Sequence, residues 1–511
     1  MHYQPGTTAM LAQDELHVAV RATKSFFYNI YDDLGFLIYD PLLRYRPRNA
    51  EQAHLPASLS DLEPRLLQSY DASDDGYVYR LQVRPGVISG HGNELTADDV
   101  KWSWDRALGL RRQGRFTARV APVHNEDSIV VRDKYLVEMT LEKPNIGFPH
   151  FLTSKYIPII DSTEARKHQA KDDPWCEGWL NAHAAGFGPF KIFSYDSNAD
   201  VVTYVANENY WEKGAPRVKR LVMRGVASPG ERLALLRRGE VDIATSLAVD
   251  DYVALPATPG LKGVRVPGHD PLLLQMNCLR QPYSDARVRR AVSYAIPYDK
   301  IMNEVWKGTA RPLESPFVDS CYGYTRAYFK YELNLPRARA LMKEAGIATP
   351  VRSRLLVHEA LAPQITATAP VIRDALREIG IEVEIAPVSD YDLRTTGFAH
   401  DFDLLLDPHI HMVPDGYYIS VCDYGDEKWG IENVNQYFNE AVFKLQAECL
   451  QVRTEAERET YMHRMQELIL EEAPQAYLLM INTLMGARDT VRGLAWDANG
   501  RMQYHQTYKL G

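Results

Sequence analysis

The segment LLLDPHIHMVPDGYY, from Leu404 to Tyr418, carries a group of polar side chains that could do chemistry. Asp407, His409 and His411 stand at every second position. Successive side chains of a strand point to opposite faces, so a strand here would put these three on one face. A carboxylate and two imidazoles on one face could form a metal site, a catalytic site or the wall of a binding pocket. The segment by itself leaves all three alternatives open.

The bulk composition limits what the whole chain can be. A chain of 511 residues is too long for one small core, so two or three lobes are expected. A net charge of −9, with no local block of Lys and Arg, argues against nucleic-acid binding. The sequence contains no run of about 18 apolar residues, so we expect no membrane-spanning helix.

The first residues, MHYQPGTTAMLAQDEL, lack the basic end and the apolar stretch of a secretory signal. Two alternatives follow: the protein stays in the cytoplasm, or the secretory signal is absent from this sequence. Five widely spaced cysteines without a CxxC pair favour free buried thiols over a disulfide framework. They are Cys176, Cys278, Cys321, Cys422 and Cys449.

The first half of the chain has the rhythm of strands and turns. The spacing predicts a strand in 77–87, a helix that begins after Thr96, two strands in 128–144 and a hairpin in 186–211. Thr96 is a good N-cap, with acidic residues in the turn that follows. A helix is also predicted from Pro229 to Arg238, ended by Gly239.

The second half has a different rhythm, that of helices alternating with strands. Helices are predicted in 284–306 with a break at Pro297, in 335–346 and in two long stretches before Pro474. The order strand, helix, strand between 351 and 388 is typical of a βαβ unit. A further strand is predicted from 401 to 410. The chain is therefore predicted to be mixed α/β with at least two lobes.

The order of these segments resembles the solute-binding proteins of ABC importers, specifically the peptide/nickel-type family of dipeptide- and oligopeptide-binding proteins. Seven blocks in family order carry this resemblance over some four hundred residues. They are YRLQVRPGV…GNELTADDVKWSWDRAL, GFGPFKI, NENYWEKGAPRVKRLVMR, RLALLRRGEVDIA, MNCLRQPYSDARVRRAVSYAIPYDKI, LPRARALMKEAG and AERETYMHRMQELILEEAPQAYLL.

The resemblance implies a two-lobed periplasmic-binding-protein clamp of type II, cluster C, with an extra β-rich domain in the first lobe. Lobe I would combine residues 1–45, 187–270 and 484–511, and the extra domain would occupy 46–186. Lobe II would contain residues 271–483, so that the chain crosses twice at a hinge. It also implies a monomer without a cofactor, on the periplasmic or extracellular face, that delivers its solute to a permease.

The family's peptide anchors are missing or displaced in this chain. Peptide-binding members hold the α-amino group of the ligand with an aspartate, and that position aligns with Ile410. The arginine that holds a dipeptide carboxylate would fall near His358 and Glu359. Because an isoleucine cannot pair with an ammonium, we favour a non-peptide solute such as a sugar, an opine or another polar metabolite. A short peptide held by another acid, such as Asp407 or Asp415, stays the alternative.

The resemblance also places candidate ligand-binding residues in several segments, each of which could equally serve packing. Four segments would contribute to the cleft. They are the loop at 24–33, the stretch 111–120 (which we interpret as a loop), the hinge strand and the turn after 414. The candidates are Phe26, Phe27, Tyr28, Asn29, Arg115, Phe116, Gln275, His358, Glu359, Asp407, His409, His411, Asp415, Tyr417 and Tyr418.

A metal-dependent hydrolase that uses Asp407, His409 and His411 is the rival from another class. The sequence has no HExxH, GxSxG or P-loop motif to support an enzyme. A binding protein that has left transport and acts as a sensor or chaperone is a further alternative. We therefore expect a non-enzymatic binding protein that closes on its solute.

Overall fold

The computed structural model describes residues 13–22, 33–49, 52, 55–110, 112–358, 363–389, 400–409, 413–426, 432–498 and 500–511. The chain divides into two compact units. The first unit contains Met1–Ala53, Ser58–Val266 and Thr483–Gly511, and the second contains His54–Ala57 and Pro267–Asn482. The lobe boundaries predicted after residues 270 and 483 lie close to the divisions after Val266 and Asn482. The extra domain predicted for 46–186 lies inside the first unit and stays a prediction.

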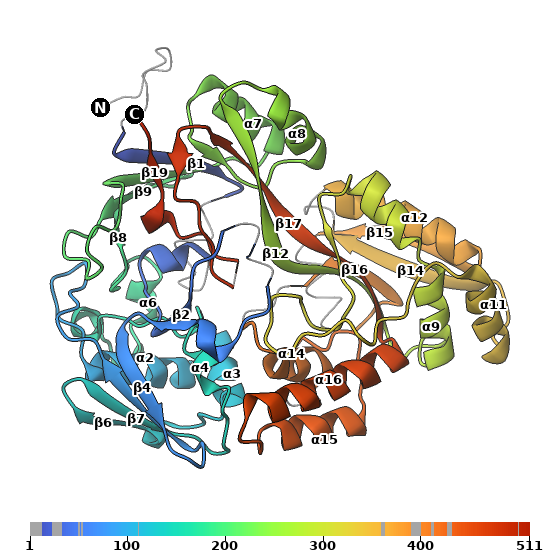
Figure 1. Ribbon diagram of the computed structural model, residues 1–511, viewed down its shortest axis with the longest axis horizontal. Coiled ribbons are helices and arrows are strands. Elements are labelled where there is room, and N and C mark those ends of the chain that lie inside the picture. Colours follow the sequence, from blue (N-terminus) through green and yellow to red (C-terminus); the bar gives the residue numbers. More distant parts are fainter. Residues whose placement is uncertain are drawn as a thin grey trace. The chain divides into compact units, whose positions relative to one another are not determined.

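The first unit contains a sheet in which parallel and antiparallel pairings are mixed (Figure 1). Strand β1 (Glu15–Val20) pairs in parallel with β10 (Arg220–Gly225) and with β11 (Ile243–Ala244). Strands β9 (Val201–Ala206) and β8 (Phe190–Asp196) continue the sheet as the predicted hairpin. Apolar residues of these strands form one core cluster, which includes Val18, Val202 and Leu221.

Helix α7 (Pro229–Arg238) lies where the sequence predicts it. The Ser228 hydroxyl accepts a hydrogen bond from the backbone N–H of Glu231, and Gly239 ends the helix with a positive φ of 75°. The first unit also contains α8 (Val249–Ala254) and two small strand pairs. These pairs are β2 (Leu43–Tyr45) with β3 (Leu62–Pro64), and β18 (Val491–Arg492) with β19 (Tyr508–Lys509).

A second, antiparallel sheet of the first unit has the strand order β4-β5-β7-β6. Its strands are β4 (Leu67–Ala72), β5 (Val78–Val83), β6 (Ile129–Asp133) and β7 (Leu136–Thr140). Helix α2 (Ala97–Gly109) begins at the predicted Thr96, which forms a capping box with Asp99. The short helices nearby are α4 (Phe148–Phe151), α5 (Ser162–Ala165) and α6 (Glu177–Leu180).

The stretch that reads as a loop at 111–120 is a helix, α3 (Gln113–Val120). Gly114, Thr117 and Ala118 are buried on one side of it, at helical spacing. A Cβ on Gly114 would lie 2.5 Å from the carbonyl oxygen of Tyr156, so the helix packs unusually close to that backbone. This close packing, which a sequence pattern does not display, explains why the loop interpretation is wrong.

The second unit is a parallel βαβ sheet extended by one antiparallel strand, in the order β15-β14-β16-β12. Its parallel strands are β14 (Val351–His358), β15 (Ile381–Val388) and β16 (Leu404–Pro408). The predicted βαβ unit is confirmed, with α12 (Pro363–Arg377) as its helix. The other helices are α9 (Ala286–Ala295), α10 (Tyr298–Lys300), α11 (Leu335–Glu344), α14 (Gly416–Tyr424), α15 (Glu440–Cys449) and α16 (Glu455–Glu472).

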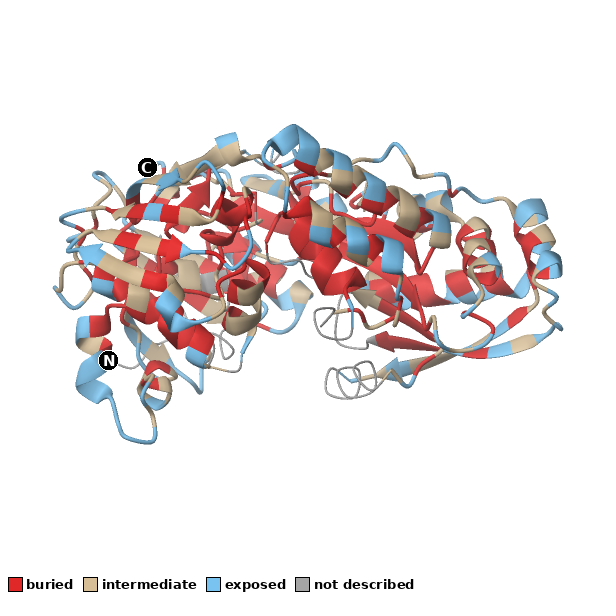
Figure 2. Ribbon diagram, turned by 90° about the horizontal axis from the view of Figure 1, so that it is seen from below, coloured by how far each residue is buried: buried red, intermediate tan, exposed pale blue. Residues whose placement is uncertain are grey.

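One face of this sheet carries an extended apolar cluster. Leucines of β12, β14 and β16 pack there against residues of α9, α11 and α12, for example Leu274 and Leu406 with Ile372. Figure 2 shows buried residues along the strands, while the exposed ones lie on the outer sides of the helices. The opposite face carries a smaller cluster around Leu356 and Leu405.

Two long strands, β12 (Leu261–Met276) and β17 (Gln475–Arg488), carry the chain between the units. Arg311, in the short strand β13 (Arg311–Pro312), holds both of them where they enter the second unit. Its guanidinium donates to the carbonyl oxygen of Gly268 at 3.2 Å and to the side-chain oxygen of Asn482. Two further hydrogen bonds, at 2.9 Å each, join the guanidinium to Asp319.

We expect Gly268→Ala to destabilise the protein strongly. The new Cβ would lie 1.9 Å from the carbonyl oxygen of Ile481, so one of the two long strands would have to move. Such overpacking costs about 1–3 kcal/mol, which urea unfolding followed by circular dichroism can measure. Gly230→Ala in α7 is the control, because its Cβ would meet nothing closer than 3.9 Å. An unchanged unfolding midpoint for Gly268→Ala would contradict the close approach.

Candidate functional site

The candidate site lies in the second unit, at the edge where its parallel strands end. The register pairs Val357 of β14 with Leu406 of β16, so the next step along places His358 beside Asp407. On the other side of β16, Asp407 pairs with Leu273 of β12. The carboxyl ends of parallel strands are where α/β proteins commonly bind ligands. The strand order therefore brings residues that are far apart in sequence to one edge of the sheet.

Gln275 is the buried polar residue of β12 on the same face as Asp407. It pairs with Leu405 in the register and is only 3% exposed. Its neighbours in the strand, Leu274 and Met276, point to the opposite face and into the core. Among the residues that the structure describes, none forms a hydrogen bond with the Gln275 amide. An amide can both donate and accept hydrogen bonds, so this group can take part in binding a polar molecule.

His409 follows β16 directly, because the strand ends at Pro408. The expected strand alternation through His409 and His411 is therefore not seen, and His411 lies outside the described residues. Proline has no N–H for the strand ladder, whereas the N–H of His409 still donates to the carbonyl oxygen of Pro271 at 2.9 Å. This hydrogen bond holds the backbone of His409 against β12. The residue is 8% exposed, so its ring is buried.

The His409 ring forms a buried ion pair with Asp423 of α14. Its Nε2 lies 3.1 Å from Oδ1 of Asp423, and both side chains are nearly inaccessible to solvent. Burial of the ring works to lower the pKa of His409. The attraction and hydrogen bond of Asp423, with the nearby charges of Glu432 and Asp407, outweigh it and raise this pKa to about 9. The imidazole is therefore charged at neutral pH.

The arrangement at this edge has the chemistry of a polar binding wall. Asp407 and Glu432 are half-buried and close enough to His409 to act on its pKa. Carboxylates accept hydrogen bonds, an imidazolium donates them, and the Gln275 amide can do both. Asp423 and Glu432 were not among the residues predicted from the sequence, since no spacing rule joins them to His409. Only the fold of α14 and of the segment after it places them here.

Asp415 has a structural task in the described structure. Its Oδ1 accepts the backbone N–H of Tyr418 at 2.9 Å, so it caps α14. Arg458 binds the same carboxylate with both terminal nitrogens, one of them at 3.1 Å, and both side chains are essentially inaccessible to solvent. The predicted role of Asp415 in ligand binding is untested, but its carboxylate is already held twice.

Tyr417 and Tyr418 lie in α14 and are buried, at 6% and 3% exposed. The Tyr417 ring lies 5.7 Å from the guanidinium carbon of Arg458, a cation–π contact within this part of the second unit. Burial raises the pKa of Tyr417 far above its usual value. Their predicted part in ligand binding stays a prediction.

The remaining candidates are placed elsewhere or not described. Arg115 and Phe116 are half-buried in α3 of the first unit and stay predictions. For His358 the structure describes the backbone, at the end of β14. The other candidates, and the substituted anchor position, lie outside the described residues. They are Phe26, Phe27, Tyr28, Asn29, Glu359, His411 and Ile410.

The described residues were also compared with the requirements of a metal site, a membrane-spanning helix and a disulfide. Within the described ranges, no group of three or more His, Cys, Asp or Glu side chains is arranged to hold a metal ion. In the same part of the chain, no helix has the length and apolar character needed to cross a membrane. All five cysteines are free thiols, four of them buried and Cys278 half-buried, so the prediction of free buried thiols is confirmed for four.

Comparison with known proteins identifies the class of protein to which this fold and edge belong. Residues 61–429 match the bacterial extracellular solute-binding proteins, family 5, in its middle region. The chain belongs to this family, and it is a solute-binding protein of the ABC-importer type. The expected family and the mixed α/β binding-protein fold are thereby confirmed.

Individual relatives are similar over most of the chain. The probable D,D-dipeptide-binding periplasmic protein DdpA of Escherichia coli K12 is 24% identical over 439 residues, which are 86% of this chain and 83% of DdpA. The periplasmic binding protein DppA of Helicobacter pylori, in complex with the peptide STSA, has a TM-score of 0.81 at 22% identity, covering 97% of this chain and 98% of DppA. AgaA of A. tumefaciens R10, in complex with agropinic acid, has a TM-score of 0.79 at 21% identity, covering 97% and 99%.

We expect Asp415→Asn to lower the free energy of unfolding by about 3–5 kcal/mol, because it leaves the buried Arg458 guanidinium without its counter-ion. Thermal and urea unfolding measure the change. Arg337→Ala is the control, since its pair with Glu344 is about half exposed and such pairs contribute at most about 1 kcal/mol. If Asp415→Asn unfolds like the wild type, the carboxylate has no structural task and is free for a ligand.

The His409–Asp423 pair predicts a pH dependence of stability. The folded pKa of His409, about 9, lies above its ordinary value of 6.5, so the stabilisation is complete below pH 6.5 and is lost as the pH rises through 9. Unfolding free energies measured between pH 6 and pH 10 should fall more steeply for the wild type than for His409→Gln. Parallel curves for the two proteins would show that the ring does not gain a proton on folding.

Proposed function

We propose that this protein captures a small polar, non-peptide solute at the strand edge of its second unit and delivers it to the permease of an ABC importer. The proposal places the protein on the extracytoplasmic side of the membrane, since the relative DdpA is a periplasmic protein. It requires no cofactor and no covalent step.

The observation that carries the proposal is the Gln275 amide. The side chain is 3% exposed, shares a face with Asp407 and forms no hydrogen bond with the described residues. An amide both donates and accepts hydrogen bonds, which suits it to the recognition of a polar solute. A solute that reaches this edge would supply the missing hydrogen bonds.

The surroundings of Gln275 favour a solute with several hydrogen-bonding groups. The edge offers carboxylates at Asp407 and Glu432 and the charged ring of His409. Directional polar groups of this kind fix the orientation of a ligand, while enclosure by apolar walls supplies affinity. A hydroxyl-rich or amide-containing metabolite fits this set better than an apolar one.

The substituted anchor argues against an ordinary peptide. Ile410 occupies the position that aligns with the family's ammonium-binding aspartate, and a buried ammonium without a carboxylate costs several kcal/mol. Among the similar structures, AgaA was determined in complex with agropinic acid and DppA of Helicobacter pylori in complex with the peptide STSA. Both solute classes are therefore compatible with this fold. A peptide held by Asp407 in place of the usual aspartate is the second candidate.

A thermal-shift screen of refolded protein tests the solute class, because unfolding strips any carried-over ligand. The plate holds sugars, opines, organic acids and nickel with histidine, against di- and tripeptides. We expect a shift with a non-peptide solute, since a ligand at a hundred times its Kd adds about 2.7 kcal/mol of stability. Shifts with ordinary peptides alone would contradict the lost anchor and favour Asp407 as its replacement.

Variants of the strand edge test the location of the site with whichever compound gives a shift. Gln275→Leu should weaken binding about tenfold or more, because it removes the buried amide that the solute satisfies. Gln451→Leu is the matched control, as Gln451 is exposed in the same unit. Calorimetric titration of the two variants gives the comparison. Equal affinities for Gln275→Leu and the wild type would place the solute elsewhere.

A further inference from the structure

His505 is a buried titratable residue in the segment 503–511 of the first unit. It lies in the short 3-10 helix η7 (Tyr504–Gln506) and is 5% exposed. Main-chain hydrogen bonds join this segment to the rest of the unit. The N–H of Arg217 donates to the carbonyl oxygen of His505 at 3.0 Å, and the N–H of Leu510 donates to that of Thr490 at 2.9 Å. The side chain of His505 therefore lies where the segment meets its neighbours.

The hydrogen bond of the His505 ring defines its protonation state. Nη1 of Arg44, in β2, lies 3.3 Å from Nε2 of His505. The same Nη1 donates to Oε1 of Gln503 at 3.1 Å. A guanidinium has five N–H donors and no acceptor. The contact is thus a hydrogen bond only when Nε2 carries no proton, so the structure selects the neutral imidazole with its proton on Nδ1.

The groups around the ring come from several segments of the first unit. They are the cations Arg44 and Arg65, the carboxylates Asp40, Glu63 and Glu212, and the phenol of Tyr210. Glu63 accepts from Nε of Arg44 at 3.0 Å, and Asp40 accepts from the Tyr210 hydroxyl at 2.6 Å.

Glu212 is the carboxylate beside the ring, but it is paired elsewhere. Its Oε2 lies 2.9 Å from Nη2 of Arg65 and 3.8 Å from Nε2 of His505, which is beyond hydrogen-bond distance. Among the described residues, no carboxylate forms a hydrogen bond with the His505 ring. A proton on Nε2 would therefore face two guanidinium groups without a carboxylate in contact.

Burial and charge both oppose protonation of the ring. Burial lowers the pKa of His505 most, and the charges of Arg44 and Arg65 lower it further. Asp40 and Glu212 compensate only in part, so this pKa is about 4, below the ordinary 6.5. An opened segment takes up the proton below pH 6.5, whereas the closed segment resists it down to about pH 4. The closed form is therefore fully stable above pH 6.5 and loses stability as the pH falls towards 4.

We propose that His505 is an acid-sensitive lock that holds the segment 503–511 against β2 at neutral pH and releases it in mild acid. When Nε2 takes a proton from the solvent, the hydrogen bond from Arg44 is lost and the imidazolium is repelled by both guanidinium groups. The opening is local, because a contiguous segment can separate without unfolding of the core. This lock does not depend on the solute proposed for the second unit.

Hydrogen exchange of the full chain, followed by mass spectrometry at pH 5 and pH 7, tests the lock. Rates are corrected for the intrinsic pH dependence of amide exchange. We expect the protection of the segment 503–511 to fall about twentyfold from pH 7 to pH 5, which is the linkage effect of a pKa of about 4 when closed and 6.5 when open. Helix α16, in the second unit, is the internal reference and should keep its protection.

His505→Gln removes the proton acceptor while it retains a hydrogen-bond acceptor. The amide oxygen can still accept from Arg44, but it does not become charged in mild acid. The protection of the segment should then change by less than about twofold between the two pH values. The variant also leaves the buried pair of Lys509 with Asp242, 3.3 Å apart, in place. It therefore separates the effect of the histidine from that of this ion pair.

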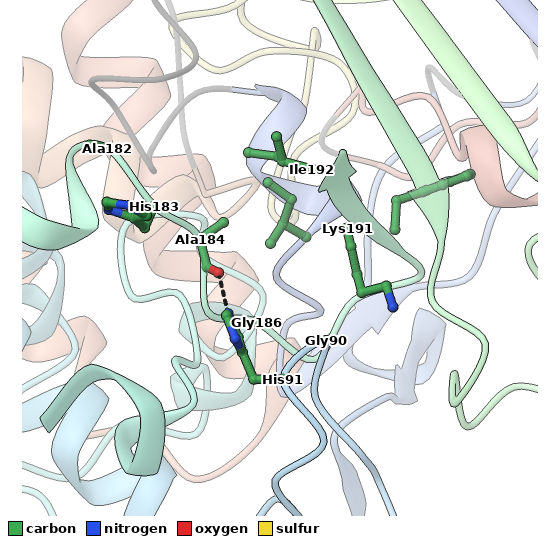
Figure 3. A pocket seen from close by; sticks show the side chains of 10 residues that line it. Gly90, His91, Ala182, His183, Ala184, Gly186, Lys191 and Ile192 are labelled. Carbon is green, nitrogen blue, oxygen red and sulfur yellow. Dashed lines mark hydrogen bonds between the residues drawn. The ribbon is translucent and has the colours of Figure 1, made fainter. Parts of the chain in front are cut away.

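His183→Gln is the matched control in the same unit. His183 is exposed and lines a pocket of about 260 Å³ together with His91 (Figure 3). Its ring stacks on Trp179, with centroids 4.8 Å apart, and belongs to no buried group of charges. This variant should keep the twentyfold dependence of the wild type.

Two results would overturn the proposal. One is a wild-type segment 503–511 with the same pH dependence as α16, and the other is a His505→Gln protein that keeps the twentyfold fall. Should His505→Gln not fold, His505→Asn, which has the shorter amide, and the wild-type comparison with α16 decide the question.

Discussion

The close passage of Gly268 beside the carbonyl of Ile481 is the constraint on which the second unit depends. At this point β12 and β17 enter the unit, and a side chain at 268 would overlap the neighbouring backbone. Arg311 ties both strands to Asp319, so their entry is fixed by charge as well as by packing. Strand β12 then pairs with β16 and sets the register that places Gln275 and Asp407 on one face.

The polar groups near that edge divide into those that hold the fold and those that face the candidate site. Asp415 caps α14 and pairs with Arg458, with no exposed surface left to the carboxylate. His409 and Asp423 also satisfy each other, but Gln275 does not have a protein partner among the described residues.

Several elements were predictable because their causes are local. Neighbouring residues determine the capping box at Thr96, the glycine that ends α7 and the alternation in β5. The structure has these elements at the predicted places. Where burial was decided by distant partners, the prediction failed. Helix α3 was read as a loop, since its packing against the backbone of Tyr156 leaves no trace in its own composition. Strand β16 ends at Pro408, earlier than predicted, because proline has no N–H for the strand ladder.

By itself, the sequence determined the family and the mixed α/β class, because these rest on local periodicity and on the order of blocks along the chain. It also made the segment from Leu404 to Tyr418 a candidate for the site. The tertiary structure decided which polar residues of that segment work together. Asp423 reaches His409 across fourteen positions and a helix, and Gln275 meets the same face from a strand more than a hundred residues earlier. Such pairs are set by strand register and helix packing, which depend on contacts between residues that are distant in sequence.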